Sequence, residues 1–141
     1  MSKSLSAAVG VATMFAVVWV GGCGETAEDR SDAGFQIDQA RLLLEALRSR
    51  FEQGKVRLQP EDAAYENTGT YVSGKLARII NKRVPEEALR EKLAALATQL
   101  SDTFKEKVEA KVMAAQPDFQ AGIAGINECL NIIQQMQAAL R

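Results

Sequence analysis

The chain has 141 residues with a net charge of −1, and 47% of its residues are apolar and 25% charged, as in an ordinary single-domain globular protein. Its 17 basic and 18 acidic residues nearly balance, which gives no basic field for nucleic-acid binding. The sequence contains no histidine, which excludes Ser-His-Asp and Cys-His catalytic pairs, His-containing zinc sites and His-ligated haem.

The N-terminal residues have the layout of a secretory signal sequence. Lys3 gives a positive start, the sixteen residues Leu5–Val20 contain no charge, and two glycines precede Cys23. Sixteen helical residues span about 24 Å, which is short of a hydrocarbon core of about 30 Å, so cleavage fits better than a permanent membrane span. We therefore predict a signal peptide, helical and hydrophobic, over residues 1–22.

The tetrapeptide Val20-Gly21-Gly22-Cys23 resembles the lipobox of bacterial lipoproteins, in which an aliphatic and two small residues precede an obligatory cysteine. The resemblance covers only the leader, and it departs from the commonest form in having Val for Leu and Gly for Ala or Ser. It implies cleavage before Cys23, a diacylglyceryl thioether on the Cys23 sulfur and acylation of its amine. Two or three acyl chains would then anchor the protein to a membrane. The alternatives are an uncleaved anchor, or ordinary cleavage that leaves Cys23 free to pair with Cys129.

Residues 23–34 are predicted to form a flexible tether. They contain four acids and one arginine but no large apolar side chain, so burial does not offset the entropy lost on ordering. As a coil they would reach about 15–20 Å. The resemblance to lipoproteins also implies that Gly24, in place of Asp, favours the outer membrane of a Gram-negative cell. We expect an envelope protein that is lipid-anchored to a membrane and faces the periplasm.

The first predicted helix of the mature domain covers Phe35 to Phe51. Apolar residues recur at intervals of three and four, and Gly54 supplies a C-terminal stop. A second helix is expected to open at Pro60-Glu61-Asp62, because proline fits the first turn and acids complement the positive end of the helix dipole. The stretch Asn67-Thr68-Gly69-Thr70 lowers helix propensity, which predicts a kink or break near Gly69.

The third helix is expected after Val84-Pro85, and its apolar stripe runs from Leu89 to Val112. The mean step near 3.8 residues makes that stripe drift by about 140° on a straight helix, so we expect its two halves to face different neighbours. A bend at Ser101-Asp102 is possible, and a continuous helix is the preferred interpretation.

The last helix is expected to start at Pro117-Asp118. Its stripe alternates steps of four and three without a slip, through the residues Phe119, Ile123, Ile126, Leu130, Ile133, Gln137 and Leu140. Gly122 and Gly125 permit close approach of another backbone, interpreted first as internal packing and second as a partner-binding face. Cys129 falls at the edge of the stripe, where a small buried thiol is expected rather than a redox or ligand role.

The sequence thus predicts an all-α fold, an antiparallel four-helix bundle over residues 35–141. Four phenylalanines are assigned to its core: Phe35, Phe51, Phe104 and Phe119. A basic run, Lys75, Arg78, Lys82 and Arg83, is interpreted as a solvent-facing surface, with docking on acidic lipid, polysaccharide or a partner as the alternative. Tyr65 and Tyr71 are candidates to line a groove near the glycine break.

Three functions remain open at this stage. The first is a membrane-anchored envelope lipoprotein that acts as a non-catalytic structural or partner-binding module. The alternative is a carrier or binder of a small apolar or lipid ligand within the bundle. The third, an enzyme that uses carboxylates such as Glu61, Asp62 and Glu66, is least favoured because these residues resemble first-turn acids. We expect no enzyme, cofactor, metal or nucleic acid, and the predicted partners are the membrane and an envelope protein.

Overall fold

The computed structural model describes residues 21–57 and 67–141, with side chains from residue 32 onward. Within these residues the chain forms four helical rods. The first rod is α1 (Gly21–Glu52), the second joins α2 (Thr68–Thr70), η1 (Tyr71–Lys75) and α3 (Leu76–Arg83), the third joins α4 (Glu87–Phe104), η2 (Lys105–Glu109) and α5 (Ala110–Val112), and the fourth is α6 (Phe119–Ala139). The segments η1 and η2 are single π-helical turns inside otherwise α-helical rods.

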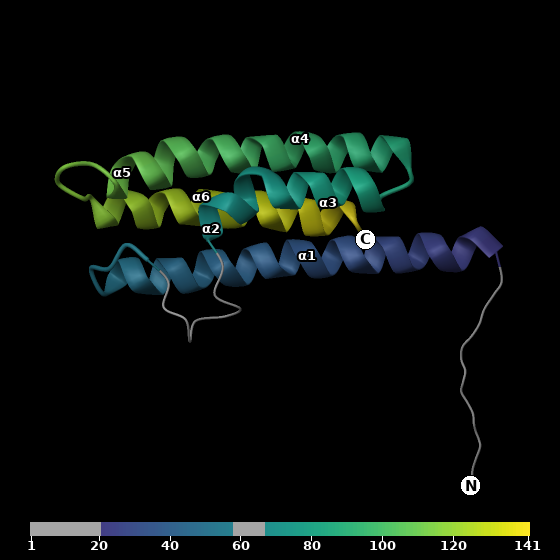
Figure 1. Cartoon of the computed structure of the whole chain (residues 1–141), viewed down its shortest axis with the longest axis horizontal. Coiled ribbons are helices and arrows are strands. Elements are labelled where there is room, and N and C mark those ends of the chain that lie inside the picture. The colour runs from purple at the N-terminus through teal and green to yellow at the C-terminus, as the bar shows by residue number, and fades with distance from the viewer. Residues whose placement is uncertain (1–20, 58–66) are drawn as a thin grey trace, which may run out of the picture.

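The rods run alternately in opposite directions and pack side by side (Figure 1). α1 contacts α3 and α6, and α4 contacts the same two helices, so the four rods close around one core. The largest fully buried side chains come from all four rods: Phe51, Ile37, Leu44, Leu76, Ile80, Leu93, Leu100, Ile126, Ile133, Met136, Val72 and Val84. The predicted antiparallel four-helix bundle is confirmed.

The start of α1 differs from the sequence prediction. The helix includes residues 23–34, which were expected to be a flexible tether. Ala33 is fully buried, and Oδ2 of Asp32 lies 3.4 Å from Nε of Arg83 on α3. The tether prediction is therefore wrong at least for this turn, because a small alanine and one ion pair join it to the bundle without a large apolar side chain. The predicted signal residues 1–20 lie outside the described residues.

The assignment of Phe35 to the core is also wrong. Its side chain is 58% exposed, whereas Ile37 and Ala40 are fully buried. Phe51 and Phe104 are buried as predicted, and the half-buried Phe119 packs its ring against Phe51 with 5.8 Å between centroids. Because Phe35 stands two residues before Ile37, it points away from the buried face of α1.

Gly54 ends the first rod as predicted. Its φ of 75° lies in the left-handed region, which glycine adopts without a steric penalty. The Gly54 N–H donates to the carbonyl of Phe51 and the Lys55 N–H donates to that of Arg50, both at 2.9 Å. These two bonds form a Schellman motif, which satisfies carbonyls that the end of a helix would leave without partners.

The two π-helical turns explain how long stripes stay buried. On a regular helix, side chains four residues apart differ in direction by about 40° around the helix axis. A π turn holds an extra residue and so reduces this difference. In the third rod, Leu100, Phe104, Val108 and Val112 are all buried at steps of four. The helix continues through Ser101-Asp102, and α4, η2 and α5 all contact α6. The expectation that the two halves face different neighbours is therefore wrong with respect to α6.

α6 begins as predicted but buries a different stripe. The side chain of Asp118 caps the helix by accepting a hydrogen bond from the Ala121 N–H at 3.0 Å. Its buried residues are Gly122, Gly125, Ile126, Cys129, Ile132, Ile133 and Met136. Several residues of the predicted stripe, including Ile123 and Leu130, are only half-buried. The buried stripe is rotated from the predicted one, which followed the large apolar residues alone. Gly122 and Gly125 lack side chains, so a neighbouring helix can approach α6 most closely at these positions.

Candidate functional site

A cleft of about 380 Å³ opens at the end of the bundle where α1 finishes. α1, the start of α2 and the η2–α5 segment form its walls. Its lining residues are Leu47, Phe51, Val56, Arg57, Asn67, Thr68, Gly69, Phe104, Val108, Glu109, Val112 and Met113. This volume lies in the range of about 300–1,000 Å³ that is typical of small-molecule sites.

The floor of the cleft is apolar and belongs to the bundle core. Leu47 and Phe51 come from α1, and Phe104, Val108 and Val112 come from the third rod; all five are buried. Two apolar side chains stand at the rim, Val56 at 37% exposure and Met113 at 69%. The surface that a ligand would meet therefore changes from a rigid apolar floor to a solvated rim.

The polar groups of the cleft differ in depth. Thr68 is 5% exposed and its Oγ1 has no hydrogen-bond partner among the described residues. Arg57 and Glu109 are exposed at the rim. The side chain of Asn67 is occupied, since its Oδ1 accepts from the Thr70 N–H at 3.1 Å and so caps α2. Among the described residues that line the cleft, the Thr68 hydroxyl is therefore the buried side-chain oxygen that has no hydrogen-bond partner.

Gly69 allows Glu109 to lie against the start of the second rod. A Cβ at position 69 would be only 2.7 Å from Oε2 of Glu109 and 3.4 Å from Cε2 of Phe104. The helix starts immediately before it, because Asn67 has an extended backbone with ψ of 108°. The predicted interruption near Gly69 therefore appears as a helix start that forms one wall of the cleft.

Tyr71 does not line a groove, contrary to the prediction. Its side chain is 2% exposed, and its hydroxyl donates to the backbone carbonyl of Gln36 at 3.1 Å and also contacts the side-chain oxygen of that residue. Tyr71 therefore ties the second rod to α1. The other groove candidate, Tyr65, lies outside the described residues, as do the candidate carboxylates Glu61, Asp62 and Glu66.

The predicted basic run is mainly solvent-facing. Arg78, Lys82 and Arg83 are exposed, and Arg83 forms its ion pair with Asp32. Lys75 is half-buried, with Nζ 5.3 Å from the centre of the Tyr71 ring. Lys82 and Arg83 occupy the last turn of α3, where positive charge complements the helix dipole.

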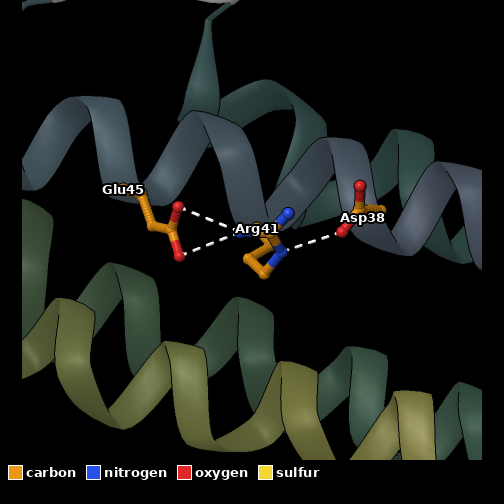
Figure 2. A network of polar contacts seen from close by, with 3 residues as sticks. All are labelled: Asp38, Arg41 and Glu45. Atoms are coloured by element: carbon orange, nitrogen blue, oxygen red, sulfur yellow. Dashed lines mark hydrogen bonds and ion pairs between the residues drawn. The ribbon is translucent and has the colours of Figure 1, made fainter.

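A second charged cluster lies along α1 (Figure 2). Nε of Arg41 donates to Asp38 at 2.8 Å, and its Nη1 donates to the two oxygens of Glu45 at 3.0 and 3.1 Å. These bonds raise the pKa of Arg41, with the bond to Asp38 as the main cause. The i,i+3 and i,i+4 spacings explain the cluster as local helix pairing between half-exposed groups.

Cys129 is a buried thiol, as predicted, and lies within the buried face of α6 rather than at its edge. Its exposed fraction is 0%. Burial raises the pKa of the thiol from 9.0 to about 12, with a smaller contribution from the charge of Glu128. Because the thiolate is the reactive form, this environment keeps Cys129 unreactive near neutral pH. The predicted lipidation residue, Cys23, stands in the first turn of α1, in the part of that helix where side chains are not described.

Among residues 21–57 and 67–141, no group of His, Cys, Asp or Glu side chains is arranged to hold a metal ion. No helix in that part of the chain combines the length and apolar character needed to cross a membrane. Comparison with known proteins gives no match to a family model, a curated protein or a solved structure.

The sequence predicts a groove near Gly69 but not the lining of the cleft found there, because that lining comes from positions with no shared motif. No pattern in the sequence singles out Val56 or Met113, and Thr68 stands out only as part of a stretch of low helix propensity. The available signal was the low-propensity stretch at residues 67–70, which places small and polar groups beside the core. Only the packing of the third rod shows that this stretch borders a cavity.

Proposed function

We propose that this chain is a lipid-anchored protein of the bacterial envelope whose helical bundle is a non-catalytic module that holds a partner protein at the membrane. The observation that carries the proposal is the sequence Val20-Gly21-Gly22-Cys23, whose last three residues open α1. An acylated Cys23 would anchor the chain through that helix.

The course of α1 supports a defined orientation for such an anchor. The helix runs from Gly21 to Glu52 without a break. Cys23 and Phe51 are 28 residues apart, which at the rise of an α-helix corresponds to about 42 Å. With Cys23 at the membrane, the cleft beside Phe51 and the exposed Met113 would lie at the far end of the bundle. That end is where a partner from the periplasm would have access.

Replacement of the proposed lipid-attachment residue tests the anchor. The full chain with Cys23→Ser should lose incorporation of labelled fatty acid and should leave the membrane fraction. Cys129→Ser is the matched control and should keep both properties, because Cys129 is buried in the bundle. Unchanged labelling and membrane retention in Cys23→Ser would refute the assignment.

Cross-linking in intact cells tests the partner-holding role. A photoreactive residue in place of Met113, which is 69% exposed, should join the wild-type chain to one recurrent envelope protein. In the Cys23→Ser background the same species should move to the soluble fraction or disappear. If the Cys23→Ser chain gives the same adduct, in the membrane fraction and at the same yield, the anchor does not hold the partner at the membrane.

Binding of a small apolar molecule is the second candidate function, and the cleft specifically favours it. An apolar floor beside the core is a common arrangement for such ligands in helical bundles. Native mass spectrometry of the full chain should then detect a retained small molecule. The variant Val56→Trp, which adds bulk at the rim, should retain less of it.

A further inference from the structure

We infer that the solvent-facing side of α6 binds a second copy of this chain, with the two α6 helices parallel and both copies in one membrane. The inference rests on the proposed lipid anchor, which sets the direction in which two copies stand. The surface, called here the amide face, consists of six exposed residues at steps of four and three: Gln120, Ala124, Asn127, Asn131, Gln134 and Ala138. This spacing is that of the contact seam in a coiled coil.

The amide face carries no charge, which sets it apart from the exposed faces of the second and third rods. Arg78 and Lys82 are exposed on α3, and Glu91 is exposed on α4. α6 contains one charged residue, Glu128, and its Oε1 lies 3.0 Å from Nζ of Lys107 in the same chain. Two copies of the amide face can therefore approach each other without repulsion between like charges.

Amide side chains suit a surface that meets its own copy. In a parallel pair of identical helices each seam residue faces the same residue of the other copy, so a charged group would face a like charge. A carboxamide has an acceptor oxygen and donor N–H groups, so it can bond to another carboxamide. Asn127 already accepts from Arg48 at 2.7 Å, whereas the amides of Asn131 and Gln134 form no hydrogen bond to another described residue. These two amides are therefore the ones that can pair fully across the interface.

The anchor sets the direction of the pair. Cys23 stands in the first turn of α1, and Figure 1 shows that α6 runs in the direction opposite to α1. When both copies are held through Cys23, both α1 helices lead away from the same membrane and both α6 helices lead back towards it. Two neighbouring copies therefore present parallel amide faces. An antiparallel pair would place the two Cys23 residues at opposite ends.

The membrane also makes a small interface sufficient. Six alanine and amide side chains bury much less than the about 1,200–2,000 Å² of a stable interface between free proteins. Two copies in one membrane have already lost part of their translational and rotational freedom, so a weaker contact holds them together, as for modules joined by a linker. We expect a dimer in the membrane and a monomer after the chain is dispersed in detergent.

Disulfide formation between single introduced cysteines tests the surface and the direction. Full chains with Ala124→Cys or Ala138→Cys are made in cells supplied with labelled fatty acid, and the isolated membranes are oxidised with copper phenanthroline. Each variant should give covalent dimers, because parallel copies bring the two Cα atoms within the about 7 Å that a disulfide allows. Ala95→Cys, exposed on α4, is the matched control and should stay monomeric. Cys129 is fully buried and should not react.

A like charge on the amide face tests how the copies pair. In the Ala124→Cys chain, the added change Gln134→Glu should lower the yield of covalent dimer by about tenfold, because two carboxylates would then face each other. Gln99→Glu is the same change at an exposed position of α4 and should leave the yield unchanged. Circular dichroism should show that both chains keep the helix content of the parent.

The outcomes separate the inference from the anchor on which it rests. If the chains carry labelled fatty acid but Ala124→Cys and Ala138→Cys give no more dimer than Ala95→Cys, the inference is wrong and the anchor stands. An unchanged yield with Gln134→Glu would also overturn the inference. So would cross-linking of Gln120→Cys to Ala138→Cys in mixed membranes, because it requires antiparallel copies. If no chain carries the label, the anchor and the inference both fail.

Discussion

The two sides of the η2–α5 segment are packed in opposite ways. Toward α6, the carbonyl group of Lys107 lies so close to Gly125 that a Cβ there would be 2.7 Å from the carbonyl carbon and would overlap the oxygen. Toward α1 and α2, the same segment borders the cleft of about 380 Å³. Close packing therefore depends on how near two backbones approach: the side with glycine is tight, while the larger side chains of the other side leave space.

The largest expected effect comes from a charge placed on the tight side. Ile126 is fully buried next to Gly125, so Ile126→Asp would bury a carboxylate without a partner. We expect a loss of about 4 kcal/mol or more, a large part of the stability of a domain this size. Thermal melts of the full chain followed by circular dichroism measure it.

Asn131→Asp is the matched control for Ile126→Asp, because it introduces the same side chain on the same helix at an exposed position. It should change stability by less than about 0.5 kcal/mol. Equal melting temperatures for the two variants would mean that the middle of α6 is not packed as the structure describes.

The next effect tests the backbone contact itself. Gly125→Ala sets a methyl group against the Lys107 carbonyl, and because a backbone cannot move as a side-chain end can, we expect a loss of about 2–3 kcal/mol. Gly122→Ala should cost less, because its Cβ would meet side-chain atoms of Val112 at 2.7 Å and Phe51 at 3.2 Å.

Gly74→Ala is expected to change stability in the opposite direction in the same series of thermal melts. Its Cβ would meet only the flexible end of Arg78, at 3.2 Å, and alanine has the higher helix propensity, so this change should be neutral or stabilising by up to about 1 kcal/mol. If Gly125→Ala behaved like Gly74→Ala, the close approach of α6 to η2 would be disproved.

The buried thiol of Cys129 on α6 makes the stability of the bundle depend on pH. Its pKa is raised to about 12 in the folded chain, against 9.0 as its ordinary value. The contribution of the buried thiol to the free energy of unfolding is therefore complete below about pH 9 and is lost as the pH rises towards 12. In that interval the Cys129 thiol ionises only in the unfolded chain. At about pH 10 the loss should be about 1.4 kcal/mol.

Comparison with Cys129→Ala isolates this contribution from other groups that titrate at high pH. Urea unfolding of both chains at about pH 8 and about pH 10 should show the stability difference between them shrink by about 1.4 kcal/mol. A constant difference would mean that the thiol is accessible to solvent in the folded state.

The bundle could be predicted from the sequence because its signals are local. The steps of three and four in α1, the stop at Gly54 and the cap at Asp118 each depend on residues within a few positions of one another. The early start of α1 was missed because the ion pair of Asp32 is with Arg83 on α3, far away in the sequence, and because the burial of Ala33 depends on tertiary packing.

A groove near Gly69 could be predicted, but the lining and size of the cleft could not, because they depend on the relative positions of three rods. The π turn η2 changes which residues of the third rod face α6, and a period counted on an ideal helix does not reveal that change. Gly122 and Gly125 did predict a close approach. They could not predict that the opposite side of the same segment would remain open.

The smallest expected effect is a gain in stability on the open side. Thr68→Val replaces a buried hydroxyl that has no partner among the described residues with a methyl group of similar size. Because the folded chain then no longer desolvates an unpaired hydroxyl, we expect stabilisation by about 0.5–1 kcal/mol in the absence of ligand. Thr70→Val, at an exposed position, should be neutral in the same thermal melts. A loss of about 1 kcal/mol for Thr68→Val would instead show that Oγ1 is hydrogen-bonded in the free protein, and would remove the asymmetry between the two sides.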